Sequence, residues 1–145
     1  MDNKISQFMK NEHRKIDGLL EEFEKSKNNN SNELKNTFNA FKGYLDKHFF
    51  IEEKVIFHIY NSSNDANFDI ISLLKDHKDI LWLISNIEDS FKNNKETPIL
   101  ELKKLLKAHI GLEDAIFYPR LDNELNDEEK SMIFDRVEEI IGDER

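Results

Sequence analysis

The sequence predicts an all-α protein, an antiparallel up-down four-helix bundle with a short additional C-terminal helix. Apolar residues recur at three- and four-residue spacing along most of the 145 residues, which is the period of helices buried on one face. The chain has only 4 Gly and 2 Pro, so little interrupts a helix. Polar stretches at about residues 25–32, 61–67 and 92–98 separate the periodic segments. Such short connections between long helices favour antiparallel neighbours.

Three helices are expected before residue 92. The first carries an apolar stripe from Ile5 to Phe23, and the second runs from about Glu33 to Tyr60. The third has apolar positions from Phe68 to Phe91. Each stripe is wide enough to bury one face of its helix against the others.

The fourth helix is expected from Pro98 toward Tyr118. Thr97 followed by Pro98 is a good N-cap and first-turn pair. Pro119 should end or kink this helix, because proline removes a backbone donor and its ring clashes with the preceding turn.

A short fifth helix is expected at about residues 127–141. Asn126 and Glu129 have the spacing of a capping box, and an apolar face follows from Met132 to Ile141. This face either forms a lid over the core or makes a dimer contact. The chain is expected to be one domain over residues 1–145, with the bundle at about 3–120, and to be a monomer or weak dimer.

Composition excludes several classes of function. The net charge of −9 disfavours nucleic acid and anionic membranes as partners. The absence of Cys excludes disulfides, thiol catalysis and Cys-ligated zinc or iron–sulfur clusters. No segment has the apolar length of a membrane span or a signal peptide, so a cytoplasmic protein is expected.

An internal repeat carries the candidate site. Glu12–Leu20 aligns with Asp76–Ile84, and His48–Phe57 aligns with His109–Tyr118. Each half therefore offers one His on its first helix and a His and a Glu, four residues apart, on its second. Residues at i and i+4 project from the same face of a helix.

Apolar neighbours place these polar groups inside the bundle. The residues that flank the first His–Glu pair are Leu45, Phe49, Val55 and Ile56, and those that flank the second are Leu105, Leu106, Leu112 and Ile116. Two buried carboxylates among four imidazoles need cations, and a metal centre would satisfy all six groups. Imidazole and carboxylate without sulfur suit iron or manganese, and also zinc. With two six-coordinate ions bridged by both Glu and by one solvent-derived ligand, about one open position per ion would remain for a small ligand.

The order His, His-x-x-x-Glu, His, His-x-x-x-Glu over about the first 120 residues resembles the hemerythrin-like (HHE cation-binding) family. The resemblance implies a non-haem, carboxylate- or oxo-bridged centre of two iron ions in a four-helix bundle. Manganese or zinc could substitute for the iron. Family members bind or sense oxygen, nitric oxide or iron, and some help repair iron centres. The metal ligands that the resemblance implies are His13, His48, Glu52, His77, His109 and Glu113.

The resemblance to the oxygen-carrying hemerythrins is less complete. Those proteins have a further His four residues before the third-helix ligand, where this chain has Leu73. They also end with Asp five residues after the last His, whereas Glu113 stands here at the four-residue spacing. The missing His should leave one iron more open, which favours reaction, sensing or labile iron over reversible oxygen carriage.

Several polar residues near the predicted ligands have less certain roles. His58 is expected at the surface or at a helix end, and Glu53 and Asp114 are expected to be surface charges. Asp17 could support the metal from outside or contact solvent. Tyr44 could donate a hydrogen bond near the metal or simply pack.

Gly18 stands where the other half of the repeat has Trp82. It could make room for that ring or open an access path to the centre, and the sequence leaves both alternatives open.

We therefore expect a di-iron protein that binds or senses dioxygen, nitric oxide or a related small oxidant. The first alternative is iron handling, meaning storage, donation or repair of iron centres. If the protein is an enzyme, we expect a peroxidase- or oxidase-type activity of the di-iron centre. A metal-free interaction module is the remaining alternative.

Overall fold

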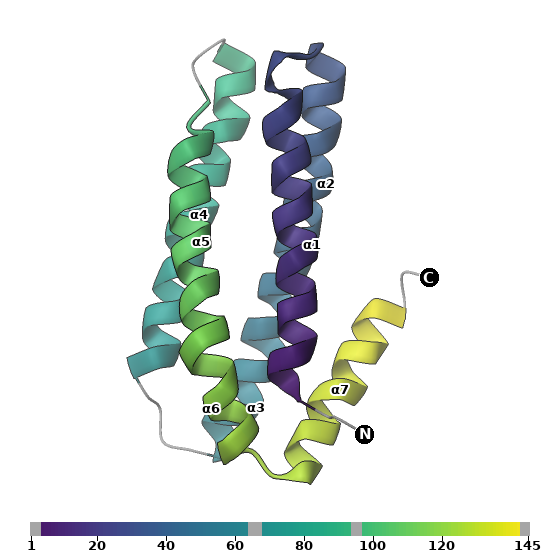
Figure 1. The fold of residues 1–145 in the computed structure, drawn as a ribbon, viewed down its shortest axis with the longest axis vertical. Helices are drawn as coiled ribbons and strands as arrows, with labels where there is room; N and C mark the ends of the chain where they lie inside the picture. The colour runs from purple at the N-terminus through teal and green to yellow at the C-terminus, as the bar shows by residue number, and fades with distance from the viewer. Residues whose placement is uncertain (1–3, 64–67, 94–96, 143–145) are drawn as a thin grey trace.

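The computed structural model describes residues 4–63, 68–93 and 97–142, and it is helical throughout, with no strand in these ranges. The helices are α1 (Ile5–Lys25), α2 (Ser31–Ile51), α3 (Phe57–Ser63), α4 (Phe68–Asn93), α5 (Ile99–Leu112), α6 (Tyr118–Glu124) and α7 (Asp127–Gly142). The predicted all-α bundle with an additional C-terminal helix is confirmed (Figure 1). Within the described residues, no helix combines the length and apolar character needed to cross a membrane.

Two π-helical segments join these helices into longer rods. Glu52–Ile56 connects α2 to α3, and Glu113–Phe117 connects α5 to α6. In Figure 1, α1 lies beside α2 while α4 lies beside α5, and α1 also packs against α5 and α6. The bundle therefore has four long rods. The first is α1, the second is α2 continued by α3, the third is α4, and the fourth is α5 continued by α6.

Two apolar clusters form the core. One contains the start of α1 together with α3, α6 and α7, and its members include Met9, Phe117 and Val137. The other fills the end of the bundle near the α1–α2 connection, with Phe23 and Phe41 among its members. On α1 and α4 the predicted His ligand lies in sequence between members of the two clusters, and on α2 and α5 it lies one residue before the last member of the second cluster. Apolar side chains therefore lie on both sides of the four His.

Helix α7 is the short C-terminal helix of the prediction, and it forms the predicted lid over the first apolar cluster. Its capping box is confirmed, because the Glu129 backbone N–H donates to Asn126 Oδ1 at 2.8 Å and the Asn126 N–H donates to Glu129 Oε1 at 2.9 Å. Ile133 and Val137 belong to the first apolar cluster, and the Phe134 ring meets Phe8 edge-on at 5.9 Å. The alternative dimer contact stays a prediction.

The start of α5 differs from the prediction. The helix begins at Ile99, and Pro98 rather than Thr97 is the residue before its first turn. The Thr97 side chain makes no cap and lies 3.2 Å from the hydroxyl of Ser90 instead. The predicted start at Pro98 and the observed start at Ile99 differ by one residue.

Pro119 does not end its helix, which continues as α6 to Glu124. The preceding turn is π-helical, and the Tyr118 N–H donates to the Glu113 carbonyl five residues back. This wider turn accommodates the proline ring without the clash that a regular α-helix would produce. The same extra residue changes which side chains face inward, so Phe117 is buried while Ile116 is 48% exposed. Leu112, just before this turn, is 39% exposed, so the expectation that Ile116 and Leu112 line the core was wrong.

Candidate metal centre

Six buried polar residues meet at the middle of the bundle, and none is more than 2% exposed. The four His come one each from α1, α2, α4 and α5, and the two Glu are the first residues of the two π-helical segments. The π turn is a feature often found at functional sites, because it changes the direction of side chains without ending the helix. These are the six residues predicted from the repeat: His13, His48, Glu52, His77, His109 and Glu113.

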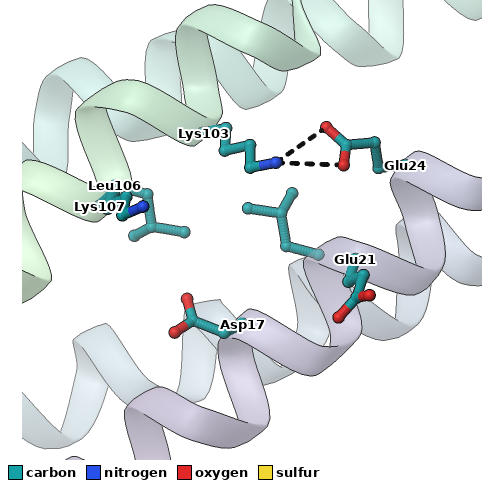
Figure 2. Close-up of a pocket in the computed structure, with 7 residues that line it drawn as sticks. Asp17, Glu21, Glu24, Lys103, Leu106 and Lys107 are labelled. Atoms are coloured by element: carbon teal, nitrogen blue, oxygen red, sulfur yellow. Dashed lines mark hydrogen bonds and ion pairs between the residues drawn. The ribbon is translucent and has the colours of Figure 1, made fainter.

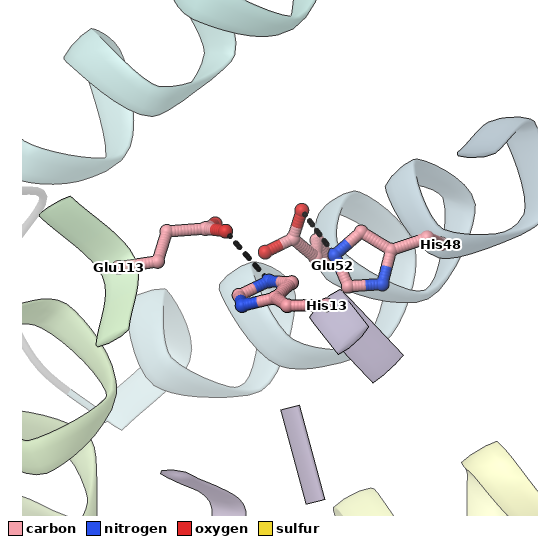
Figure 3. Close-up of side chains that lie close together, drawn as sticks. All are labelled: His13, His48, Glu52 and Glu113. Carbon is pink, nitrogen blue, oxygen red and sulfur yellow. Dashed lines mark ion pairs between the residues drawn. The ribbon is translucent and has the colours of Figure 1, made fainter. Parts of the chain in front are cut away.

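The six residues form two overlapping groups, within each of which the possible ligand atoms lie within 4.8 Å of one another. The first group is His13 and His48 with both Glu (Figure 3), and the second is His77 and His109 with the same two Glu. Both carboxylates therefore belong to both groups. This is the arrangement needed for two neighbouring ions that share bridging carboxylates.

The two carboxylates are presented differently. Glu113 Oε1 lies 3.2 Å from His13 Nε2, and its Oε2 lies 3.4 Å from His109 Nε2, so it offers one oxygen to each group. Glu52 turns a single oxygen toward both groups, since Oε1 lies 3.3 Å from His48 Nε2 and 3.1 Å from His77 Nε2.

Tyr118 accounts for this difference, and the sequence reasoning missed it. Its buried hydroxyl donates a hydrogen bond to Glu52 Oε2 and lies 3.5 Å from Glu113 Oε2. Burial and the two nearby carboxylates raise the pKa of Tyr118, so the phenol keeps its proton. The repeat offered a signal for this residue. Tyr118 stands where the first half has Phe57, so the second half carries an additional hydroxyl at this position. A buried Tyr usually has a hydrogen-bond partner for its hydroxyl.

Three carboxylates contact the histidines from outside the centre. His13 Nδ1 lies 2.8 Å from Asp114 Oδ1, and His109 Nδ1 lies 2.9 Å from Asp76 Oδ2. His77 Nδ1 lies 2.8 Å from Glu53 Oε2. A carboxylate on Nδ1 fixes the ring orientation and leaves Nε2 free to ligate a metal.

The prediction that Glu53 and Asp114 are surface charges is therefore wrong, because each contacts a buried histidine. They are 34% and 27% exposed, so each reaches inward from the bundle surface. The expectation relied on their lying about 100° from the preceding Glu on their own helix. That angle points them at a neighbouring helix, where a histidine nitrogen lies.

The metal-free centre holds protons on some of its histidines. Burial lowers the pKa of His13, but hydrogen bonds with Asp114 and Glu113 outweigh it and raise the pKa to about 10. For His109 burial is again outweighed, chiefly by Glu113, and its pKa rises to about 9. Burial lowers the pKa of His48 to about 4, so this ring is neutral.

The two carboxyl groups are shifted in opposite directions. Burial, followed by the charge of Glu113, raises the pKa of Glu52. Burial would also raise the pKa of Glu113, but hydrogen bonds from Glu52, His109 and His13 lower it below its usual range. The protons that His13 and His109 hold in the metal-free centre are those that a binding metal would displace.

The residues present fit a metal cation. The buried His13 Nε2 lies 3.2 Å from the buried Glu113 Oε1, and the buried His109 Nε2 lies 3.4 Å from Glu113 Oε2, but neither contact has the geometry of a full hydrogen bond. These atoms face the middle of the cluster, where their contacts are the ion pairs between Glu113 and the two histidines. Leaving such atoms unsatisfied is costly, and an ion would satisfy them. Nitrogen and oxygen donors without sulfur suit iron, manganese or zinc.

The structure places the remaining candidate residues outside the six. His58 is exposed on α3 and belongs to neither group, as expected. The Tyr44 hydroxyl donates to Glu12 Oε2 at 2.5 Å, so its bond goes to a residue beside His13. A Cβ added to Gly18 would meet nothing within 4 Å, and Trp82 is 65% exposed, so Gly18 does not make room for that ring.

Asp17 lies on the edge of a surface hollow between α1 and α5, with a volume of about 280 Å³ (Figure 2). Leu20 and Leu106 also line the hollow, and a Lys103–Glu24 ion pair of 3.2 Å spans it. Burial raises the pKa of Asp17, while the charge of His13 opposes this rise. Asp17 is therefore close enough to His13 to act on it electrostatically, and it is not a member of either group.

Comparison with protein families matches residues 4–121 of the chain to the hemerythrin HHE cation-binding domain. The matched range contains all six buried residues and both π-helical segments. Comparisons with curated proteins and with solved structures return no match.

Proposed function

Because the chain belongs to the hemerythrin HHE cation-binding family, we propose that it holds two iron ions and binds or senses dioxygen, nitric oxide or a related small oxidant. One observation carries the proposal: two groups of buried ligand atoms share both of their carboxylates. Two ions in these groups would lie next to each other and act as a pair.

In this proposal the iron would be held by the Nε2 atoms of the four His and by the carboxylate oxygens of both Glu that face them. Glu113 turns both of its oxygens toward the histidines, whereas Glu52 would contribute Oε1, because Tyr118 holds Oε2. When bound, iron in such a ligand set supplies open coordination positions and a change of redox state. Manganese and zinc suit the same donors and are possible substitutes.

The rest of the bundle keeps bulk water from the centre. The two apolar clusters lie on either side of it, and the Phe49 ring stacks on His77 at a centroid distance of 3.8 Å. The Tyr118 hydroxyl is a hydrogen-bond donor beside the carboxylates. A buried site with apolar side chains on both sides suits a small, weakly polar ligand such as dioxygen or nitric oxide.

Elemental analysis of protein expressed with iron and purified without chelator tests the proposal. We expect about two irons per chain, and we expect Glu52→Gln combined with Glu113→Gln to abolish binding of the pair, because both bridges lose charge. Changes in the visible spectrum on adding dioxygen or nitric oxide to the reduced protein would then identify the ligand. Full iron occupancy in the double variant would contradict the proposed centre.

Iron handling is the second candidate, and Leu73 favours it. This residue lies one turn before His77 on α4, is fully buried in an apolar cluster and supplies no ligand atom. Each ion would therefore have only two His. Rapid loss of one iron to a mild chelator would support storage or donation, and two tightly held irons would count against it. Steady turnover with peroxide would instead indicate a peroxidase-type enzyme.

A further inference from the structure

We infer that the two metal positions are unequal, and that the ion between His13 and His48 is held more weakly and is lost first. The inference rests on the proposed function and concerns which of the two positions is labile. Both groups have two His and share both Glu, so the ligand atoms alone predict equal affinities. The difference must come from residues behind the ligands.

The outer carboxylates are distributed unevenly. In the second group both histidines have one, because Glu53 contacts His77 and Asp76 contacts His109. In the first group only His13 has one, from Asp114. The Nδ1 atom of His48 is buried and has no hydrogen-bond partner among the residues that the structure describes.

This gap is a break in the symmetry of the repeat. Asp76 is equivalent to Glu12, just as His109 is equivalent to His48. The symmetric partner of His48 Nδ1 would therefore be Glu12, which is itself 6% exposed. Its Oε2 instead accepts a hydrogen bond from the hydroxyl of Tyr44. The other half has Leu105 at the position of Tyr44, so Asp76 has no such competing donor there.

A metal bound to Nε2 of a histidine leaves a proton on Nδ1. Where a carboxylate accepts that proton, the ring is oriented and its nitrogen is a better ligand. Where the Nδ1–H is buried without an acceptor, no outer group strengthens the metal–nitrogen bond, and the N–H remains without a hydrogen bond. Loss of one such outer partner typically lowers metal affinity about 10- to 100-fold.

Ring packing acts in the same direction. The His77 ring stacks on Phe49 at 3.8 Å with an interplanar angle of 16°, and on Phe57 at 6.0 Å with an angle of 21°. His13 and His48 meet each other edge-on at 5.0 Å, and within the described part of the chain neither ring is stacked on another aromatic ring. The second group therefore contains one histidine, His77, that stacked rings hold in place before a metal arrives, and the first group contains none among the described residues.

The decisive experiment titrates the metal-free protein with Co²⁺ and follows both calorimetry and the visible spectrum of the bound ion. We expect two steps with affinities about 10- to 100-fold apart. The matched variants His48→Ala and His109→Ala remove equivalent residues of the two halves. His48→Ala should abolish the weaker step and keep the tighter one, and His109→Ala should do the reverse.

Two milder variants test the outer groups without removing a ligand. Asp76→Asn should weaken the tighter step, and Asp114→Asn should weaken the weaker step, each about 10- to 100-fold. Tyr44→Phe should strengthen the weaker step, because Glu12 becomes available to His48. Circular dichroism of each metal-free variant verifies that it is folded.

The outcomes separate the inference from the proposed function. Absence of Co²⁺ and iron uptake by the folded wild-type protein would overturn both. Uptake of two ions with the tighter step lost in His48→Ala, or with equal losses in the two variants, would overturn only the inference. An unchanged weaker step in Tyr44→Phe would overturn the role of Tyr44.

Discussion

Single side chains outside the six predicted ligands hold the centre in its geometry. Tyr118 determines that Glu52 presents one oxygen to both groups, while Asp114 and Glu53 fix two of the histidine rings. Each of these contacts joins residues from different helices. The ligands are therefore arranged by the whole bundle as well as by their own spacing on a helix.

Replacing Tyr118 with Phe should destabilise the metal-free protein. The substitution keeps the ring but leaves Glu52 Oε2 buried without its donor, which typically costs about 1–3 kcal/mol. Urea denaturation of the metal-free variant measures the change. The matched control is Tyr60→Phe, because the Tyr60 hydroxyl donates to Glu124, whose side chain is exposed. Equal losses of stability in the two variants would show that the Tyr118 hydroxyl has no special role at the centre.

At the level of helices, the two π-helical segments are the feature that positions the site. Each begins at a predicted bridging Glu, and in each the carbonyl of that Glu accepts an N–H from five residues on, from Phe57 or Tyr118. The extra residue in the turn lets Glu52 point into the centre while the helix continues beyond it. Because both halves of the repeat contain the segment at the same position, it belongs to the repeated unit.

The start of α1 depends on another helix. Lys4, at its N-cap position, makes no side-chain cap, and the carboxylate of Asp122 on α6 accepts the N–H groups of Ile5 and Ser6 at 2.7 and 3.2 Å. A carboxylate at a helix N-terminus satisfies free donors and also opposes the positive end of the helix dipole.

Replacing Asp122 with Ala should therefore lower the free energy of unfolding by about 1–2 kcal/mol, the usual range for a lost N-cap. Thermal and urea denaturation measure it. Asp79→Ala is a suitable control, since Asp79 is exposed on α4 and a surface substitution of this kind changes stability by about 0.5 kcal/mol or less. A loss for Asp122→Ala no larger than the control would contradict the capping role.

Over the whole molecule, the polar layer and the apolar clusters contribute separately to stability. The clusters on either side of the centre bury large side chains such as Phe23, Phe41 and Phe117, none more than 2% exposed. They should keep the helices folded when the centre contains no metal. Bound metal then adds stability by mass action, because the unfolded chain has no assembled site.

Chelation of the metal should lower the melting temperature while leaving the helical circular dichroism at room temperature unchanged. A metal at a hundredfold excess over its Kd stabilises the native state by about 2.7 kcal/mol. Melting curves of the loaded, chelated and reloaded protein test this. Collapse of the helical signal on chelation would show that the metal is needed for folding, and an identical melting temperature with no metal uptake would favour an interaction module.

The sequence alone determined the helices, the capping box of α7 and the six residues that come together. All three depend on regularities that are local along the chain: the helical period of apolar residues, the spacing of Asn126 and Glu129, and the four-residue spacing of His and Glu. The repeat extended this local information, because two equivalent halves on antiparallel helices must bring equivalent residues to the same level of the bundle.

Only the tertiary structure decided how those six residues are held. Asp114 lies 101 residues from His13 in sequence, and Tyr118 lies 66 residues from Glu52, so no local pattern could pair them. The π turns and the continuation of α6 past Pro119 also depend on packing, since each sacrifices regular helical hydrogen bonding to place a side chain in the core. Spacing along one helix fixes which residues face inward, whereas partners on other helices fix their orientation.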